Sequence, residues 1–270
     1  MKQLLLTSYC LLLFLPISIS AQRHEIIDNN IRSLQVVANQ NWLTLPIMYL
    51  NGGKISIDFD DLTHTYRRMT YSIEHCEADW KTSENLFDSA DGFLNDNLID
   101  DVRESTLTNT LYTHYHLEIP NKDCQPKISG NYRLTVFDDN KKPLLTACFM
   151  LIEPAENAMG VKLSVTTQTD ATINDANQQV EMAVNYGNYI VSNPQQQIKT
   201  VVLQNRNWLD ARWNSKPQYV MNNGLQWIHD KDYIFWGGNE YRKFELLSTD
   251  VASMGIDHVA WDGNNFHAYP

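Results

Sequence analysis

The chain has few of the features that mark membrane proteins or nucleic-acid-binding proteins. After residue 21, no stretch approaches the ~18 consecutive apolar residues of a membrane-spanning helix. Basic residues are also scarce, since 21 Lys and Arg stand against 32 Asp and Glu, for a formal net charge of −11. An acidic chain of this kind is repelled by nucleic acid and by anionic lipid headgroups. We therefore expect no nucleic-acid partner and no membrane span.

The sequence motifs of common active sites are missing too. The chain has no nucleophile elbow G-x-S-x-G, no P-loop and no dinucleotide-binding glycine pattern. His75 and Cys76 are neighbours on an expected strand and point to opposite faces, so they do not form a catalytic pair. Paired carboxylates occur throughout an acidic chain, so their presence does not indicate the active site of a hydrolase. We predict a protein that is not an enzyme, with no cofactor and no small-molecule substrate.

Cysteine is rare, with four residues in 270. Cys10 lies in an N-terminal segment that we expect to be removed, which leaves Cys76, Cys124 and Cys148. An odd number of cysteines in an exported protein leaves at least one thiol unpaired. Cys148 lies in an apolar run and is expected to be a buried core thiol. Whether Cys76 and Cys124 form a disulfide stays open.

The first 21 residues have the organisation of a secretory signal peptide. A short cationic start, Met1-Lys2-Gln3, precedes a mainly apolar run from Leu4 to Ile19. The small residue Ala21 then stands just before the chain turns polar. This arrangement predicts cleavage after Ala21 and export of the remainder.

Alternation of apolar and polar residues with a period of two dominates the exported part, while helical periodicity is nearly absent. Apolar residues alternate along several expected strands: Ile55, Ile57 and Phe59; Met69, Tyr71 and Ile73; Tyr115, Leu117 and Ile119; Tyr132, Leu134 and Val136; Val161, Leu163 and Val165; Val180, Met182 and Val184. The run 144–152 is apolar on both faces, which is typical of a central strand. These patterns predict an all-β protein.

Residues 153–157 (E-P-A-E-N) interrupt the alternation and mark an expected domain boundary. We predict two antiparallel, immunoglobulin-like β-sandwich domains in series, at 22–155 and 156–270, after a signal peptide at 1–21. Further strands of the second domain are expected at 198–204, 243–246 and 256–261. The chain ends where another strand is expected, so the second sandwich is either naturally short or incomplete, and both alternatives stay open.

An acidic segment from Glu77 to Leu111 has no clean period. A connection of this length is usually functional or contains its own short helix. On length and charge we choose it as the candidate partner interface, with these residues: Asp88, Asp91, Phe93, Asp96, Asp100 and Asp101. Its spacing does not fit an EF-hand calcium loop, and an irregular oxygen cage of Asp91, Asn95, Asp96 and Asn97 is the weaker alternative.

Two further patterns suggest ligands. His114 and His116 lie two residues apart and share a strand face with Glu118, but zinc needs three or four ligands and only this strand supplies them. A polar surface face is therefore the better interpretation, and we predict no metal site. Four tryptophans of the second half, Trp208, Trp213, Trp227 and Trp236, could stack on sugar rings, although tryptophans more often fill cores. A carbohydrate-binding or adhesion-type β-sandwich module is therefore the alternative function.

Several ordered motifs resemble one protein family of the Bacteroidota. The run 75–80 (H-C-E-A-D-W) is similar to the family signature H-C-N-A-D-W, with Glu77 at the position of the asparagine. Further similar segments are Asp91-Gly92-Phe93, Tyr112-Thr113-His114-Tyr115, Ile119-Pro120-Asn121, Ser129 to Leu134, Val202 to Asn205, Lys216-Pro217 and Gly237 to Arg242. This family, formerly a domain of unknown function, is the plug protein of the type IX secretion system. The resemblance covers residues 31–270, and family members usually continue past the position of Pro270.

The resemblance implies a role without catalysis. A plug of this family binds the periplasmic mouth of a large outer-membrane β-barrel translocon and closes it when no substrate is engaged. It would be periplasmic and peripherally associated with the outer membrane. The motif residues are expected to be structural, with Gly92 and Gly130 in turns and Trp80 and Tyr132 in packing.

Overall fold

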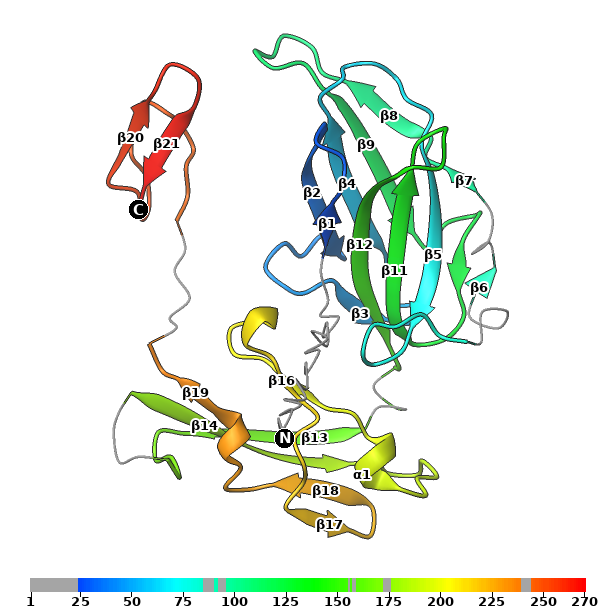
Figure 1. Cartoon of the computed structure of the whole chain (residues 1–270), viewed down its shortest axis with the longest axis vertical. Coiled ribbons are helices and arrows are strands. Elements are labelled where there is room, and N and C mark those ends of the chain that lie inside the picture. Colours follow the sequence, from blue (N-terminus) through cyan, green and yellow to red (C-terminus); the bar gives the residue numbers. More distant parts are fainter. Residues whose placement is uncertain are drawn as a thin grey trace, which may run out of the picture. The chain divides into compact units, whose positions relative to one another are not determined.

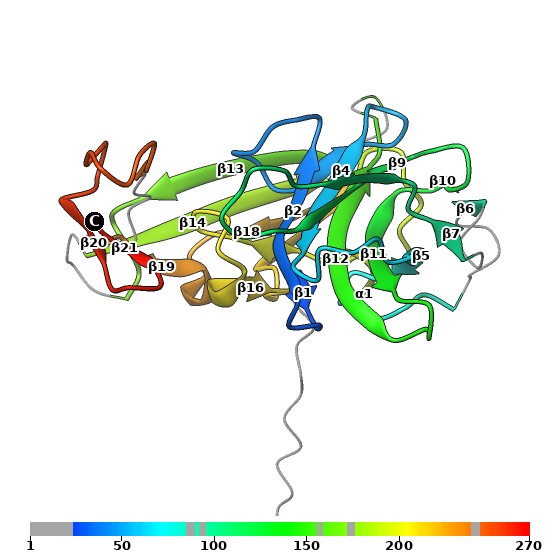
Figure 2. The same ribbon diagram turned by 90° about the horizontal axis from the view of Figure 1, so that it is seen from above.

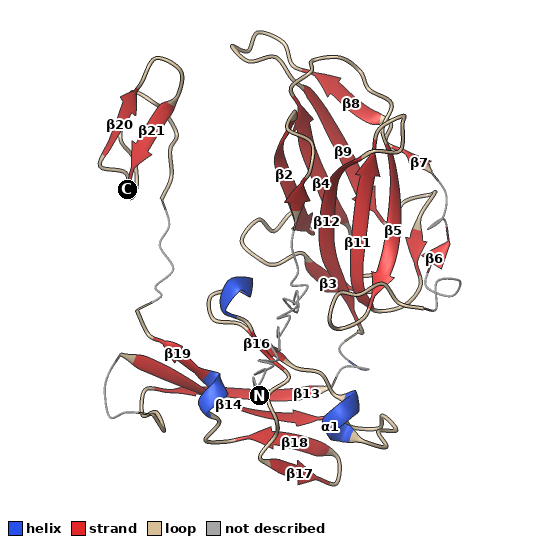
Figure 3. Cartoon of the chain, viewed as in Figure 1, coloured by secondary structure: helices blue, strands red, loops and turns tan. Residues whose placement is uncertain are grey.

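The structure is a computed structural model that describes residues 24–84, 90–91, 96–154, 156, 159–171, 176–238 and 244–270. The expected signal peptide, 1–21, lies outside these residues. The chain divides into two units, residues 1–158 and 159–270 (Figure 1). Helical elements are short and include α1 (Pro194–Gln197) and two 3-10 turns, η2 (Trp208–Asp210) and η3 (Lys231–Tyr233) (Figure 3). The prediction of an all-β fold with antiparallel sheets is confirmed. None of these helical segments is long or apolar enough to cross a membrane.

The first unit contains two main sheets. One is six-stranded, with the order β1-β12-β11-β5-β7 and with β3 paired in parallel to β12. The other is four-stranded, with the order β2-β4-β9-β8. The strands of the first sheet are β1 (Glu25–Ile26), β3 (Ile47–Tyr49), β5 (Thr70–Cys76), β7 (Asn97–Leu98), β11 (Gly130–Phe137) and β12 (Pro143–Ile152). Those of the second are β2 (Ile31–Ala38), β4 (Ile55–Asp61), β8 (Asp101–Glu104) and β9 (Thr113–Ile119).

The two sheets face one another and enclose a single apolar core (Figures 1 and 2). Burial alternates along β4 and β9, because every second side chain of a strand points to the same face. Within the core, the rings of Phe59 and Tyr115 stack at 5.2 Å between centroids, and those of Tyr132 and Phe149 at 5.5 Å. The central position expected for residues 144–152 is confirmed, since β12 pairs with β11 on one side and with β1 and β3 on the other.

The acidic segment is not a continuous loop, which corrects the sequence interpretation. It contains β6 (Ala90–Asp91), which pairs with β10 (Gln125–Pro126), and it also contains β7 and β8. β7 extends the first sheet beside β5, and β8 extends the second sheet beside β9. Between them, the buried Ile99 donates its N–H to Met69 O at 3.0 Å. Strands of two to four residues are too short to display a period of two, so the pattern could not reveal them.

The second unit is built on one five-stranded sheet with the order β13-β14-β18-β17, with β19 paired to β14. A two-stranded ribbon, β15–β16, contributes Val202 to the core over one face of this sheet. A separate hairpin, β20–β21, forms its own two-stranded sheet. The strands are β13 (Gly160–Thr166), β14 (Asn177–Asn185), β15 (Val201–Val202), β16 (Arg212–Trp213), β17 (Tyr219–Met221), β18 (Gly224–Trp227), β19 (Ile234–Trp236), β20 (His258–Trp261) and β21 (Phe266–Tyr269).

Two expected strands of this unit differ from the structure. The strand expected at 198–204 is reduced to the two residues of β15. Residues 244–246, expected as part of a strand, have no strand conformation, and Lys243 lies outside the described residues. Alternation in so short a segment does not specify a strand unless a neighbouring strand is present to pair with it.

Candidate interaction site and the motif block

The H-C-E-A-D-W motif forms the end of β5 and a tight turn after it. Trp80 N–H donates to Glu77 O at 2.9 Å, and Ser83 N–H donates to His75 O at 2.9 Å. Trp80 takes a left-handed backbone conformation with φ of +63°, yet its side chain is almost fully buried. The turn thus carries a large aromatic side chain back into the first unit.

Two residues of the Ser129 to Leu134 motif, both on β11, bind the backbone of this turn. Asn131 Nδ2 donates to Glu77 O at 3.0 Å, and Arg133 Nη2 donates to Trp80 O at 2.6 Å. The Arg133 guanidinium also lies 3.7 Å from Glu74 Oε2. Side chains of β11 thus bind two backbone carbonyl groups of the turn. The two motifs, more than fifty residues apart in the chain, form one structural unit, which we call the motif block (residues 74–83 and 129–133).

His75 is fixed at the centre of the motif block. Its Nδ1 lies 2.8 Å from Ser83 Oγ, and its Nε2 lies 3.2 Å from Ser129 O. Gly130 has φ of +147°, and a Cβ added there would lie only 2.2 Å from His75 Nε2. Glycine at 130 therefore both permits the backbone conformation and leaves room for the imidazole. Both ring nitrogens take part in structural contacts, which supports the expectation that the motif residues are structural.

A third motif, at 119–121, closes the turn after β9. Asn121 Oδ1 accepts hydrogen bonds from the N–H groups of Asp123 and Cys124, both at 2.9 Å. Its Nδ2 donates to Tyr71 Oη at 2.8 Å and to Glu118 O at 2.9 Å. The asparagine side chain thus links the turn to the opposite sheet. Burial raises the pKa of the Tyr71 hydroxyl to about 12, so this group stays protonated near neutral pH.

The three cysteines in the described part of the chain, Cys76, Cys124 and Cys148, are buried, and none of them forms a disulfide. The open alternative of a Cys76–Cys124 bridge is therefore not realised in the structure, and the expected burial of Cys148 is confirmed. Burial raises the pKa of Cys76 to about 11 and that of Cys124 to about 12. Because the thiolate is the reactive form, neither thiol is suited to act as a nucleophile.

His114 and His116 face carboxylates that sequence reasoning did not place beside them. His114 Nδ1 lies 2.8 Å from Asp60 Oδ1, and His116 Nδ1 lies 2.6 Å from Asp58 Oδ1. The register of β4 against β9 aligns these pairs, and strand pairing across more than fifty residues cannot be read from periodicity. Among the described residues, no group of three or more His, Cys, Asp or Glu side chains is arranged to hold a metal ion.

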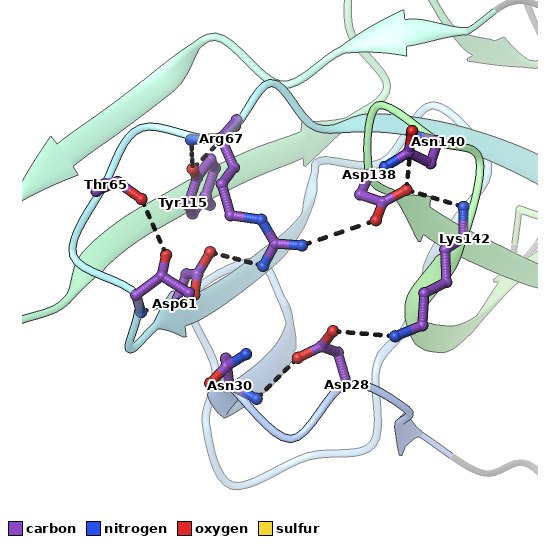
Figure 4. A network of polar contacts seen from close by, with 10 residues as sticks. Asp28, Asn30, Asp61, Thr65, Arg67, Tyr115, Asp138, Asn140 and Lys142 are labelled. Carbon is purple, nitrogen blue, oxygen red and sulfur yellow. Dashed lines mark hydrogen bonds and ion pairs between the residues drawn. The ribbon is translucent and has the colours of Figure 1, made fainter.

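A buried ion pair closes the other end of the first unit (Figure 4). Asp61 is fully buried, and its Oδ2 lies 3.0 Å from Arg67 Nη1, while Thr63 N–H donates to its Oδ1 at 3.0 Å. Arg67 N–H donates to Tyr115 Oη, and that hydroxyl donates to Arg67 O, both at 2.9 Å. Arg67 Nη2 also lies 3.9 Å from Asp138 Oδ2. The network joins β4, β9 and the turn after β11.

The residues chosen as partner interface are only partly described. Asp88 and Phe93 lie outside the described residues, and so does Asn95 of the alternative calcium cage; of Asp91 only the backbone, in β6, is described. Asp96 forms an ion pair with Lys141, and Asp101 Oδ1 lies 3.3 Å from Arg103 Nε. Asp100 is exposed in the connection between β7 and β8. The described members therefore lie along the edge where the chain passes from one sheet to the other.

The four tryptophans of the second unit do not share one surface. Trp227 is buried in the core, and its Nε1 donates to Ser215 O at 2.8 Å. Trp208 and Trp213 are half-buried and contact each other at 5.8 Å between ring centroids. Trp236, 58% exposed, lies at the end of β19. A four-tryptophan sugar platform is therefore not present, because burial of Trp227 removes one of its members.

The comparisons with known proteins agree with the motifs. Residues 31–153 match the family model described as type 9 secretion system plug protein 1st domain. The chain is similar to the crystal structure of a hypothetical protein from Parabacteroides merdae ATCC 43184, with 31% sequence identity and a TM-score of 0.81. That similarity covers 91% of this chain, and the chain spans 62% of the length of the solved protein. No curated protein matches the chain.

The matched region contains both main sheets of the first unit, except for β1, and the complete motif block. The family name links this domain to the type 9 secretion machinery. Residues 31–153 therefore match the first domain of type 9 secretion system plug proteins, the family that the motifs resemble.

Proposed function

We propose that this protein is a non-enzymatic, periplasmic plug subunit that closes the periplasmic mouth of the outer-membrane translocon of type IX secretion. The observation that carries the proposal is the family match over residues 31–153. It is supported by the structural roles of the motif residues, whose polar atoms contact one another and the backbone around them. The proposed mechanism is steric occlusion by a folded β domain that associates reversibly, at the periplasmic face of the outer membrane.

Affinity purification from the native organism tests the partner. A tagged chain should co-purify with a large outer-membrane β-barrel protein, and deletion of its gene should raise the permeability of the outer membrane. Purification of an intact translocon that lacks this protein in every functional state would contradict the proposal.

We propose that the acidic segment is the part of the protein that contacts the translocon. Its described carboxylates are exposed or half-exposed, and long-range attraction to a basic rim would speed association. We expect the triple variant Asp96→Lys, Asp100→Lys and Asp101→Lys to lower co-purification at least about tenfold, because the three new positive charges would be repelled by a basic rim. A matched control with the same change in net charge, Asp123→Lys, Asp139→Lys and Asp257→Lys, should bind like the wild type. Equal binding by both triples would remove the acidic segment from the interface without affecting the proposed plug role.

The carbohydrate-binding alternative depends on the exposed Trp236 and on the Trp208–Trp213 pair. Glycan-array binding that is lost in Trp236→Ala or Trp213→Ala, together with no barrel partner in the purification, would favour it over the plug. We expect the wild-type protein to show no such glycan binding.

A further inference from the structure

The edge strand β13 carries a row of apolar side chains that no described residue of the second unit covers. Val161, Leu163 and Val165 alternate along the strand and are 56–59% exposed. In the β13–β14 register they lie opposite residues that are 5–7% exposed, namely Val184, Met182 and Val180. Directly opposed residues of an antiparallel pair point to the same face of a sheet. The exposed row is therefore a continuation of the core face, beyond the cover that β15 supplies.

The hairpin β20–β21 has a complementary apolar face. Its register pairs Val259 with Ala268 and Trp261 with Phe266, so these four side chains share one face. The rings of Trp261 and Phe266 contact each other at 4.6 Å between centroids, yet the two residues are 55% and 53% exposed. The opposite face carries two histidines, His258 and His267, and is the more polar one.

Neither element is complete by itself. An isolated two-stranded hairpin is at best marginally stable in water and needs a further strand, a sheet face or a helix to pack against. An exposed apolar edge strand is in turn a site at which another segment binds. Neither the β13 row nor the apolar face of the hairpin contains a charged residue, so bringing them together would leave no charge without water or a partner.

We propose that the apolar face of the β20–β21 hairpin docks on the Val161–Leu163–Val165 row. The hairpin would then extend the layer that the β15–β16 ribbon forms over this face of the sheet. The row spans four residue steps, or ~13 Å, and each strand of the hairpin spans three, or ~10 Å, at the usual rise of a strand. Between Trp236 and His258, a hydrogen bond from Glu245 N–H to Met254 O closes residues 245–254 into a loop. The roughly ten other residues of the connection span up to ~35 Å when extended, so the connection does not prevent docking. The resulting arrangement is the face-to-face packing of two sheets.

The hairpin is a better occupant of β13 than a second copy of the chain. A single edge strand of seven residues offers far less surface than the ~800 Å² per partner of a stable protein interface. The hairpin, in contrast, is tethered to the same unit, which gives it an effective concentration of the order of millimolar. Docking of the hairpin therefore requires only a small contact area.

Disulfide trapping in the full exported chain tests the docking. The double variant Leu163→Cys/Phe266→Cys should form an intramolecular disulfide under mild oxidation, detected by mass spectrometry of non-reduced peptides. In the control Lys162→Cys/Phe266→Cys, the first cysteine lies on the opposite face of β13. The native thiols are buried in the first unit and do not compete. We expect a yield at least about tenfold above the control; equal yields, or disulfides only between chains, would overturn the proposal.

Hydrogen exchange gives a second readout that needs no substitution. In the wild-type chain, the amides of β20 and β21 should exchange at least about tenfold more slowly than in a synthetic peptide of residues 256–270. The same exchange rate in the chain and in the peptide would mean that the hairpin does not dock, and would overturn the proposal.

Discussion

At the scale of single residues, Asp61 of the first unit is fully buried, and a buried carboxylate is costly unless a partner compensates its charge. Arg67 supplies that partner at 3.0 Å. Arg67→Ala should therefore lower the free energy of unfolding by about 2–4 kcal/mol, because it leaves a buried carboxylate without its partner. Urea unfolding followed by tryptophan fluorescence measures the change.

The neighbouring residue gives a matched control. Arg68 pairs with Asp139 at 3.9 Å, and both side chains are largely exposed. An exposed pair of this kind contributes less than about 1 kcal/mol. Arg68→Ala should therefore leave the unfolding midpoint nearly unchanged, and an equal loss in the two variants would show that the buried pair has no special role.

The cysteines lead to a second prediction for individual residues. Cys76 and Cys124 are buried, and burial raises the pKa of each above its ordinary value of 9.0. At pH 8 the native protein should therefore react with a thiol reagent such as DTNB much more slowly than the protein in urea, in which all three thiols should react at once. Rapid labelling of the native protein would contradict the burial of these thiols.

At the scale of elements, the motif block depends on the close approach of β11 to the turn after β5. Gly130→Ala places a Cβ 2.2 Å from His75 Nε2 and strains a backbone with φ of +147°. We expect a loss of about 2–4 kcal/mol in the free energy of unfolding, from the sum of backbone strain and overpacking. In Gly160→Ala, where the nearest atom is at 3.7 Å, the loss should be within about 1 kcal/mol. Urea unfolding compares the two variants, and a Gly130→Ala protein as stable as the wild type would contradict this account of the motif.

The sequence predicts those elements whose length exceeds a few residues and whose two faces differ. β4, β9 and β11 have seven or eight residues each, and their alternation identifies the buried side correctly. β7 and β8 have two and four residues and lie at sheet edges, so the acidic segment is read as a loop. Their conformation depends on pairing with β5 and β9, and local sequence does not encode a partner so far away.

The sequence predicts which residues of the candidate site share a strand face, but not which strands bring them together. Alternation places Asp58 and Asp60 on one strand face and His114 and His116 on another, but only the pairing of β4 with β9 brings the two sets together. The motif block is likewise visible as conspicuous residues, while the contact of Arg133 with Trp80 O depends on the pairing of β11 with β5. Residue type and face are local properties, whereas proximity is set by the topology of the sheets.

At the scale of the whole molecule, the core of the first unit draws all its buried residues from positions 31–151. The family match covers nearly the same range, 31–153. A fragment of residues 22–158 should therefore fold by itself and unfold cooperatively, because its apolar core is complete. Circular dichroism during urea unfolding tests this, and a fragment without a cooperative transition would mean that the first unit needs the second.

The pH dependence of stability reports on the same core. The unfolded chain loses its thiol protons near the ordinary pKa of 9.0, whereas folded Cys76 keeps its proton until pH reaches about 11 and Cys124 until about 12. Between these limits the unfolded state binds fewer protons than the folded state, so the free energy of unfolding falls as pH rises. This contribution is fully present below pH 9 and is lost as pH rises through about 11–12. We expect the urea midpoint of the first unit to drop between pH 8 and pH 11, and to drop less in Cys124→Ala than in the wild type. A midpoint with the same pH dependence in the variant would show that other groups, such as the buried tyrosines, control alkaline unfolding.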